Sequence, residues 1–326
     1  MNDNDASPVI FLRRIFPLLV AMAALLGIFQ VWVPNFLSAA NMIDLAQQIS
    51  VNAILAFGMT LTILIGGIDL SVGAVIALVG TVTVAILSLG GGEPQTFFQF
   101  MVALFSGLGV ALLFGGFNGI CASKTGIPPF IITLATMQVA RGCALRFNEG
   151  RPMPVPDSQQ LYLSLGNGRL FEFLPVPVVI MLIIFVAMAL LLHKTQFGRH
   201  LFAIGGNRTA AWLSGIPLLR RETVVYMICA VLAGVAGMIH SAQLYSAEPA
   251  SGAGFELNAI AAVVVGGTSF TGGIGSMHGT LLGAVIIGIL DKGLNQAGVH
   301  FSLQYVTKGV VILGAVYLDV LRQRKG

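Results

Sequence analysis

An aspartate in the stretch GGIDLSVG, which runs from Gly66 to Gly73, is the residue of this chain best placed to do chemistry. A charged side chain at the centre of a bilayer costs about 2.5 to 3.5 kcal/mol on insertion scales, so Asp69 needs a compensating role in an apolar chain. A carboxylate ahead of a helix accepts hydrogen bonds from the free N–H groups and complements the positive end of the helix dipole. We therefore expect Asp69 or Ser71 to cap the helix that follows. A direct role for Asp69 in a transport path is the alternative.

No motif for catalysis, nucleotide binding or metal binding occurs in the chain. Lys124 and Thr125 are preceded by serine and lack the glycine loop of G-x-x-x-x-G-K-[ST], and H-E-x-x-H, G-x-S-x-G and C-x-x-C are absent. The histidines occur singly, and the three cysteines have no metal-like spacing, which is typical of small buried hydrophobes. The sequence therefore predicts no catalytic residue, no metal site and no cofactor bound by this chain.

Acidic residues within the apolar stretches are few. Besides Asp69 they are Asp291, which neighbours Lys292, and Asp319, which lies near the end of an apolar stretch. Ion-coupled carriers place acidic residues in pairs or facing water inside their spans. Three scattered carboxylates are a thin set for a proton relay.

The composition places these residues in a membrane. Of the 326 residues, 56% are hydrophobic and only 9% are charged, against about 25% charged in a soluble domain. The mean hydropathy is +0.90. The net charge of +4 does not suggest a nucleic-acid partner. The first apolar run, Ile15 to Val33, exceeds the roughly 7 to 15 residues of a signal-peptide core, so we expect it to remain as a spanning helix.

Charge-free windows divided at glycine and proline clusters predict an all-α polytopic membrane protein with about ten spanning helices. The eighth helix is short, and we expect it to be broken rather than fully spanning. The predicted helices cover residues 15–34, 46–65, 71–89, 97–120, 127–144, 174–193, 222–242, 257–270, 279–298 and 302–320.

Lysine and arginine positions predict that both termini lie on the cytoplasmic side. With the N-terminus inside, the inner side collects Arg13, Arg14, Lys124, Lys194, Arg199, Arg208, Arg220, Arg221, Arg322, Arg324 and Lys325. The outer side collects Arg141, Arg146, Arg151 and Arg169. The predicted organisation is one membrane domain over residues 15–321 between tails at 1–14 and 322–326. It has an outer loop at about 147–172, where prolines disfavour helix, and an inner loop at about 194–222.

Two glycine-interrupted segments resemble each other along the chain. At an offset of 206 positions Asn52–Ile54 falls on Asn258–Ile260, and Gly66–Ile68 falls on Gly272–Ile274. Each segment consists of an apolar run, a glycine break and a new helix, which is typical of segments that line a translocation route. Chance alignment of sequences biased in composition is the alternative.

The inner loop contains GRHLFAIGGNRTAAWLSGIP, from Gly198 to Pro217. Asn207 is a favourable N-cap for a short helix over 208–213, which Gly215 and Pro217 end. A small-residue surface would let this helix enter the groove of a soluble motor subunit, and its members are Ala210, Ala211, Ser214 and Gly215. The alternative is an interfacial helix that places Phe202, Ile204 and Trp212 in lipid.

Three motifs together resemble the permease subunits of bacterial ribose-type ABC sugar importers, over about residues 40 to 320. They are GGIDLSVG, AIGGNRTAAWLSGI and ELNAIAAVVVGGTSFTGGIGSMHGTLLGAVIIGIL. Asp291 and Lys292 depart from the family, whose members often carry uncharged amides there.

The resemblance implies a multi-pass protein of the bacterial inner membrane that imports a monosaccharide from the periplasm. The implied partners are a cytoplasmic ABC ATPase that binds ATP and magnesium, a periplasmic sugar-binding protein and a second permease subunit, expected to be an identical copy, in addition to membrane lipid. It favours ATPase docking over the interfacial alternative for the inner loop. The implied docking residues are Gly198, Asn207, Arg208, Ala210, Ala211, Ser214 and Gly215.

We expect the spans to bend at their glycine breaks as the transporter alternates between inward-open and outward-open states. The expected gate residues are Gly66, Gly67, Asp69, Ser71, Gly73, Gly266, Gly267, Gly272 and Gly273. A carrier that works without an ATPase, either ion-coupled or facilitative, is the alternative function, and it would need Asp69 as its coupling acid.

Overall fold

The computed structural model describes residues 8–89 and 96–323, which are almost entirely helical. Parts of the predicted tails, residues 1–7 and 324–326, lie outside the described residues. The helices are α1 (Pro8–Trp32), α2 (Ala39–Leu64), α3 (Val72–Ser88), α4 (Phe97–Lys124), α5 (Pro129–Arg146), η2 (Phe147–Gly150), α6 (Gln160–Asn167), α7 (Val176–Lys194), α8 (Gln196–Gly206), α9 (Arg208–Leu213), α10 (Leu218–Gln243), α11 (Phe255–Val265), α12 (Met277–Gln296) and α13 (Phe301–Gln323).

Two antiparallel pairs of two-residue strands complete the described fold. Strand β1 (Met153–Pro154) pairs with β4 (Ser246–Ala247), with Met153 opposite Ala247. Strand β2 (Arg169–Leu170) pairs with β3 (Leu174–Pro175), with Arg169 opposite Pro175. Strand pairs this short hold loops together and do not form an extended sheet. The predicted all-α polytopic class is therefore confirmed.

Seven described helices are long and apolar enough to cross a membrane: α1, α2, α4, α5, α7, α10 and α12. Each of the ten predicted spans overlaps a helix, but α3 and α11 are shorter, at 17 and 11 residues. At a rise of 1.5 Å per residue, α11 extends only about 17 Å, well short of the roughly 30 Å of a hydrocarbon core. The structure thus ends the eighth predicted span early, at Val265.

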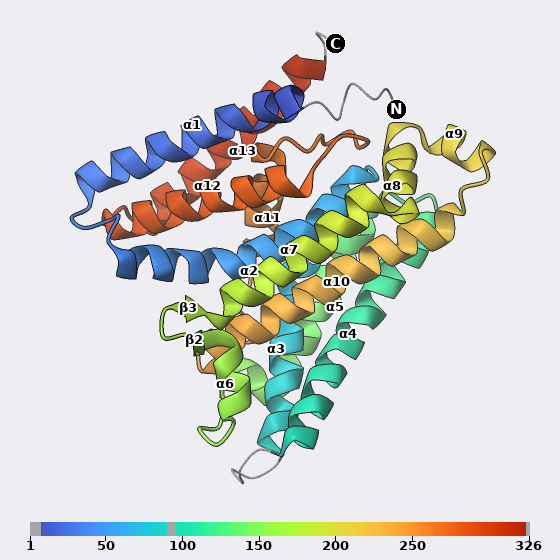
Figure 1. Ribbon diagram of the computed structural model, residues 1–326. Coiled ribbons are helices and arrows are strands. Elements are labelled where there is room, and N and C mark those ends of the chain that lie inside the picture. Colours follow the sequence, from blue (N-terminus) through green and yellow to red (C-terminus); the bar gives the residue numbers. More distant parts are fainter. Residues whose placement is uncertain (1–7, 90–95, 324–326) are drawn as a thin grey trace.

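Helix α2 lies at the centre of the bundle. In its most apolar window 83% of the residues are buried, against 6% for α1. A helix that is apolar on all sides can face either lipid or other helices, so the burial of α2 marks it as the central one. Helices α7, α10, α11 and α12 pack around α2, and α1 packs outside them on α12 (Figure 1).

Glycines let the backbones of α4 and α10 approach closely. A Cβ placed at Gly115 would lie 2.6 Å from the carbonyl oxygen of Tyr226 and 2.8 Å from the Cα of Met227. Membrane helices gain little from hydrophobic exclusion when they associate, so such van der Waals contact carries much of their packing energy.

The segment predicted as an irregular loop at about 147–172 is more ordered than expected. Its prolines precede α6, which packs on α10. Tyr162 of α6 is fully buried and its hydroxyl lies 2.6 Å from Ser241 Oγ. Burial raises the pKa of the Tyr162 hydroxyl, which therefore stays protonated. Sequence patterning missed α6 because its eight residues are too few to show a helical period.

Two charged residues that the sequence analysis names, Asp291 and Arg141, form polar contacts in the structure. Asp291 on α12 forms an ion pair with Lys308 on α13, at 3.1 Å between carboxylate and ammonium. Arg141 on α5 donates hydrogen bonds to the carbonyl oxygens of Pro249 and Ser251, at 2.8 and 2.5 Å. The Arg141 contact fastens α5 to the loop ahead of α11.

The bundle has two distinct ends. In Figure 1 helices α8 and α9 lie at the upper right, towards which the start of α1 and the end of α13 also point. Helix α6 and the β2–β3 pair lie at the lower left. We refer to these as the α9 end and the α6 end.

The α4–α10 crossing gives a stability prediction. In Gly115→Ala the new methyl group must displace α10 backbone, at a cost of about 1 to 3 kcal/mol for overpacking. We expect a lower midpoint of thermal unfolding in detergent. Gly116→Ala is the matched control on the same helix, because a Cβ there meets nothing within 4 Å. Equal midpoints for the two variants would contradict the close crossing.

Candidate functional site

Helix α2 ends in a Schellman motif built on two glycines. Gly66 has φ 79°, its N–H donates to Ile63 O at 2.9 Å, and the N–H of Gly67 donates to Thr62 O at 2.8 Å. These bonds satisfy two carbonyls that the end of a helix leaves free. A side chain at Gly67 would overlap the hydroxyl of Tyr226 from α10. Gly66 is therefore favoured because of its positive φ, and Gly67 because Tyr226 leaves little space for a side chain.

The Asp69 side chain organises the turn between this break and α3. Asp69 is fully buried, and its Oδ1 accepts hydrogen bonds from the N–H and the hydroxyl of Ser71, at 2.9 and 2.5 Å. Ser71 occupies the N-cap position of α3 but makes no side-chain capping bond. The predicted side-chain cap is therefore wrong: the carboxylate binds Ser71 itself rather than the N–H groups of the following turn.

Neighbouring helices hold this turn from two directions. Asn118 of α4 donates to Ser71 Oγ at 3.0 Å. Thr133 of α5 donates to Ile68 O and accepts from the N–H of Leu70, both at 3.1 Å. Backbone groups released at the end of a helix need such partners where packing excludes water. The break is thus a fully supported feature rather than a frayed end.

A second break follows α11 and repeats the same motif. Gly267 has φ 86° and donates to Val264 O at 2.8 Å, while Thr268 donates to Val263 O at 3.1 Å. Gly266 lies against α12, where a Cβ would overlap Gly279 O. The structural counterpart of Gly66 is thus Gly267, an offset of 201 rather than the 206 of the sequence match.

Three segments meet at a point that we call the glycine junction, formed by Leu64, Gly205, Gly272 and Gly273. The N–H of Gly273 donates to Leu64 O at 2.9 Å, which joins the second break to the first. A Cβ at Gly205 of α8 would overlap both Leu64 O and the amide nitrogen of Gly273. Gly272 and Gly273 have φ of 85° and 73°. Sequence analysis missed Gly205, because nothing local distinguishes it from its neighbour Gly206.

Gly73, another expected gate residue, lies at the start of α3 and away from the junction. A Cβ there would overlap the carboxylate of Glu256 and the carbonyl oxygen of Gly252. Gly73 therefore allows the start of α3 to approach the start of α11. Its role is close packing beside the breaks rather than bending at them.

Helix α9 has the boundaries and caps that the sequence predicts. Asn207 accepts a hydrogen bond from the N–H of Ala210 at 2.9 Å. Gly215 has φ 81° and donates to Trp212 O at 2.9 Å, and Ile216 donates to Ala211 O at 3.1 Å. A six-residue helix is marginal alone, so these bonds at both ends define it.

The exposed surface of α9 differs from the predicted small-residue surface. Ala210, Ser214 and Gly215 are exposed, and the Ser214 hydroxyl bonds Ala210 O, but Ala211 is only 4% exposed. Trp212 and Leu213 add apolar surface, with 63% and 74% exposed.

Two other residues of this loop face the protein. Ile204, which the interfacial alternative places in lipid, is 2% exposed. Gly198 is buried, and a side chain there would overlap Leu192 O at the α7–α8 turn. Both belong to the support beneath α9 rather than to its surface.

A buried carboxylate ties α9 to α10. Glu222 accepts from Arg208 Nε at 2.7 Å and Nη2 at 3.2 Å, with 8% of the Glu222 side chain exposed. The hydrogen bond to Glu222 raises the pKa of Arg208, which lies outside the spans.

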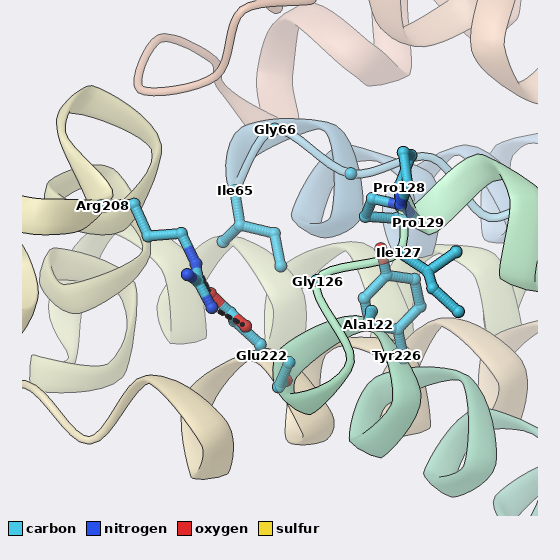
Figure 2. A pocket seen from close by; sticks show the side chains of 12 residues that line it. Ile65, Gly66, Ala122, Gly126, Ile127, Pro128, Pro129, Arg208, Glu222 and Tyr226 are labelled. Carbon is cyan, nitrogen blue, oxygen red and sulfur yellow. Dashed lines mark hydrogen bonds and ion pairs between the residues drawn. The ribbon is translucent and has the colours of Figure 1, made fainter.

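This ion pair borders a pocket of about 260 Å³ beneath the Gly66–Gly67 break (Figure 2). Among the described residues no group of three His, Cys, Asp or Glu side chains could hold a metal ion.

The chain is similar to known transport proteins over most of its length. Residues 41–316 match the model of a family described as the permease component of branched-chain amino acid transport systems. The ribose import permease of Bacillus subtilis is 44% identical over 88% of this chain and 86% of its own length. That of Escherichia coli K12 is 42% identical over 94% and 93%. The D-allose transport permease of Escherichia coli K12 is 38% identical over 92% and 90%.

No solved structure matches the chain. The match to the family model covers most of the described residues and includes both glycine breaks and α9. The chain therefore belongs to this family of permease components and is a transport subunit of an ABC importer rather than an enzyme.

Proposed function

We propose that the chain carries a neutral monosaccharide of the ribose, allose or arabinose class into the cytoplasm, driven by a separate ATPase. The observation that carries this proposal is the contact at Gly205 between both glycine breaks and α8, the helix that leads into the exposed α9. Relatives named for the import or transport of such sugars agree with it. The chain itself has no nucleotide-binding loop. In this proposal a partner that binds ATP supplies the energy.

The proposed docking surface for the ATPase is the exposed side of α9. Trp212 and Leu213 supply the apolar area that anchors protein interfaces, and Ala210 lets a partner approach closely. Glu222 balances the charge of Arg208 at the start of the helix, whereas the exposed Arg220 that follows it places a positive charge beside the surface. An acidic groove on the ATPase would complement it.

The glycine junction supports a route for the movement. Helix α8 leads directly into α9, and Gly205 near its end touches Leu64 and Gly273 without an intervening side chain. A displacement of α9 by the ATPase would therefore press on the ends of both breaks at once. Packed elements of this kind switch between discrete arrangements instead of deforming gradually.

The proposed function also includes a membrane topology for the chain, a periplasmic partner and a second copy of the chain. Ten crossings, the eighth of them made by α11 together with the break that follows it, would place the α9 end and both termini in the cytoplasm and the α6 end in the periplasm of a bacterial inner membrane. A periplasmic sugar-binding protein would meet the α6 end and select the sugar. The working unit would contain two copies of this chain.

A carrier without an ATPase is a second candidate, favoured by one observation. Asp69 Oδ2 is buried without a hydrogen-bond partner among the described residues, as the site of a transported proton could be. Asp69→Asn discriminates between the functions in vesicles free of ATP. Proton-driven uptake that the substitution eliminates would establish the carrier, whereas we expect no uptake from either protein without the ATPase.

Charge on the exposed side of α9 tests the docking surface. Ala210→Glu would bury an unpaired carboxylate in the interface, so we expect sugar uptake to fall about tenfold or more and the ATPase to be lost on purification. Ala211→Glu is less informative, because Ala211 packs inside this chain. Leu161→Glu adds the same charge to the exposed side of α6 at the other end, and it serves as the control for co-purification of the ATPase, which it should leave intact. Normal uptake by Ala210→Glu would refute the docking assignment.

The glycine junction gives a separate prediction. In Gly205→Ala the methyl group must separate α8 from Leu64 and Gly273, and overpacking of about 1 to 3 kcal/mol corresponds to roughly 5- to 150-fold in a coupled equilibrium. We expect uptake to fall by that factor while the ATPase still co-purifies. Gly206→Ala, whose Cβ meets nothing within 4 Å, should transport normally. Equal uptake by the two variants would remove the junction from the coupling route.

A further inference from the structure

The pocket beside the Gly66–Gly67 break is enclosed by elements that the transport cycle moves. Its walls come from that break, the end of α4, the α4–α5 turn, Arg208 of α9 and the first turns of α10. In Figure 2 Arg208 and Glu222 face the cavity from one side and Tyr226 from the other, with Ile65 and Gly66 above. A molecule bound here would touch both the break and the docking helix.

The Tyr226 hydroxyl is the group in this pocket that lacks a partner. Tyr226 is 1% exposed, and its hydroxyl has no hydrogen-bond partner in the part of the chain that the structure describes. A buried hydroxyl left unpaired costs about 1 to 3 kcal/mol. A ligand that offers a donor or an acceptor would remove that cost.

The charge in the pocket selects a neutral ligand. Arg208 and Glu222 neutralise each other through two hydrogen bonds, and Glu222 is nearly buried. An anion would have to approach the Glu222 carboxylate, and a cation would have to approach the Arg208 guanidinium. A neutral molecule with several hydroxyls can form hydrogen bonds at the edge of the Arg208–Glu222 pair without breaking the two hydrogen bonds between these side chains.

The size and the apolar wall narrow the ligand further. The volume of about 260 Å³ falls below the roughly 300 to 1,000 Å³ of pockets that hold drug-sized molecules. Ile65, Ile127 and Pro128 add apolar surface beside the polar groups (Figure 2). A small ring with apolar faces and hydroxyls around its edge fits this mixed lining.

We propose that this pocket is a second binding site for a monosaccharide, on the α9 end, where the hydroxyls of the sugar bind Tyr226 and the Arg208–Glu222 pair. The inference rests on the proposed function, because that function supplies the sugar at this end. Sugar bound here lies between the break and the docking helix and holds them together. Accumulated cytoplasmic sugar therefore slows the turnover of the importer.

The test uses the purified full chain in lipid nanodiscs and ligand-observed NMR titration with ribose, arabinose and allose. Tyr226→Phe removes only the hydroxyl, and we expect at least one of these sugars to bind about three- to tenfold more weakly, the value of one hydrogen bond. Tyr245→Phe is the control, because Tyr245 is 55% exposed and lies outside the pocket. Ribose 5-phosphate, which carries the charge that Glu222 opposes, should bind more weakly than ribose. Matching thermal unfolding midpoints would show that the variants are folded.

Two results would overturn the site while leaving the proposed function intact. One is uptake of a sugar by the complete importer, together with equal sugar binding by the wild type and Tyr226→Phe. The other is tighter binding of ribose 5-phosphate than of ribose. If the complete importer, with its binding protein and ATPase, transports none of the three sugars, the proposed function fails and the ligand class fails with it. Inhibition of transport by sugar on the α9 side, lost in Tyr226→Phe, would support the regulatory consequence.

Discussion

The structure depends on the need to satisfy backbone polar groups where helices stop against other segments. Helices α2 and α11 each end at a break, and the carbonyls and N–H groups that they release must find partners within the chain where packing excludes water. The chain meets this need with Schellman motifs after α2 and α11, with Thr133 against the backbone at Ile68 and Leu70, and with the bond from Gly273 to Leu64. Because the last of these bonds joins the two breaks, neither can rearrange without the other.

This constraint explains why so much of the packing relies on glycine. A positive φ at Gly66 and Gly267 permits the two motifs, and the absence of a side chain at Gly205 permits a third segment to reach them. The contact at Gly205 is backbone to backbone, so no side-chain rotation can absorb a displacement of α8. Because backbone contacts hold the breaks in place, few polar side chains are needed within the spans. A translocation route with few polar side chains binds sugar weakly, which suits a transporter that must release its sugar.

The sequence predicted what local signals determine. Asn207 and Gly215 define α9 through bonds to residues within a few positions, so its boundaries were readable without any tertiary information. The two breaks were readable for the same reason, as glycine clusters between apolar runs. Burial on one side of a six-residue helix depends on what lies beneath it, and the inward position of Ala211 was therefore not predictable. The same applies to Gly205, since its role comes from Leu64 and Gly273, which are distant in the chain.

Longer-range polar pairs were the other limit of sequence reasoning. A carboxylate ahead of a helix has two competing local partners, and in the structure Asp69 binds Ser71 instead of capping α3. Glu222 attracted no attention in the sequence because it stands at the edge of an apolar run, yet its bond to Arg208 connects α9 to α10. That connection has a mechanical consequence. Under the proposed docking, a movement of α9 would reach the first break by two paths, one through Gly205 and Leu64 and the other through Glu222, Tyr226 and Gly67. Two short paths that converge on one break would let a six-residue helix act on its conformation.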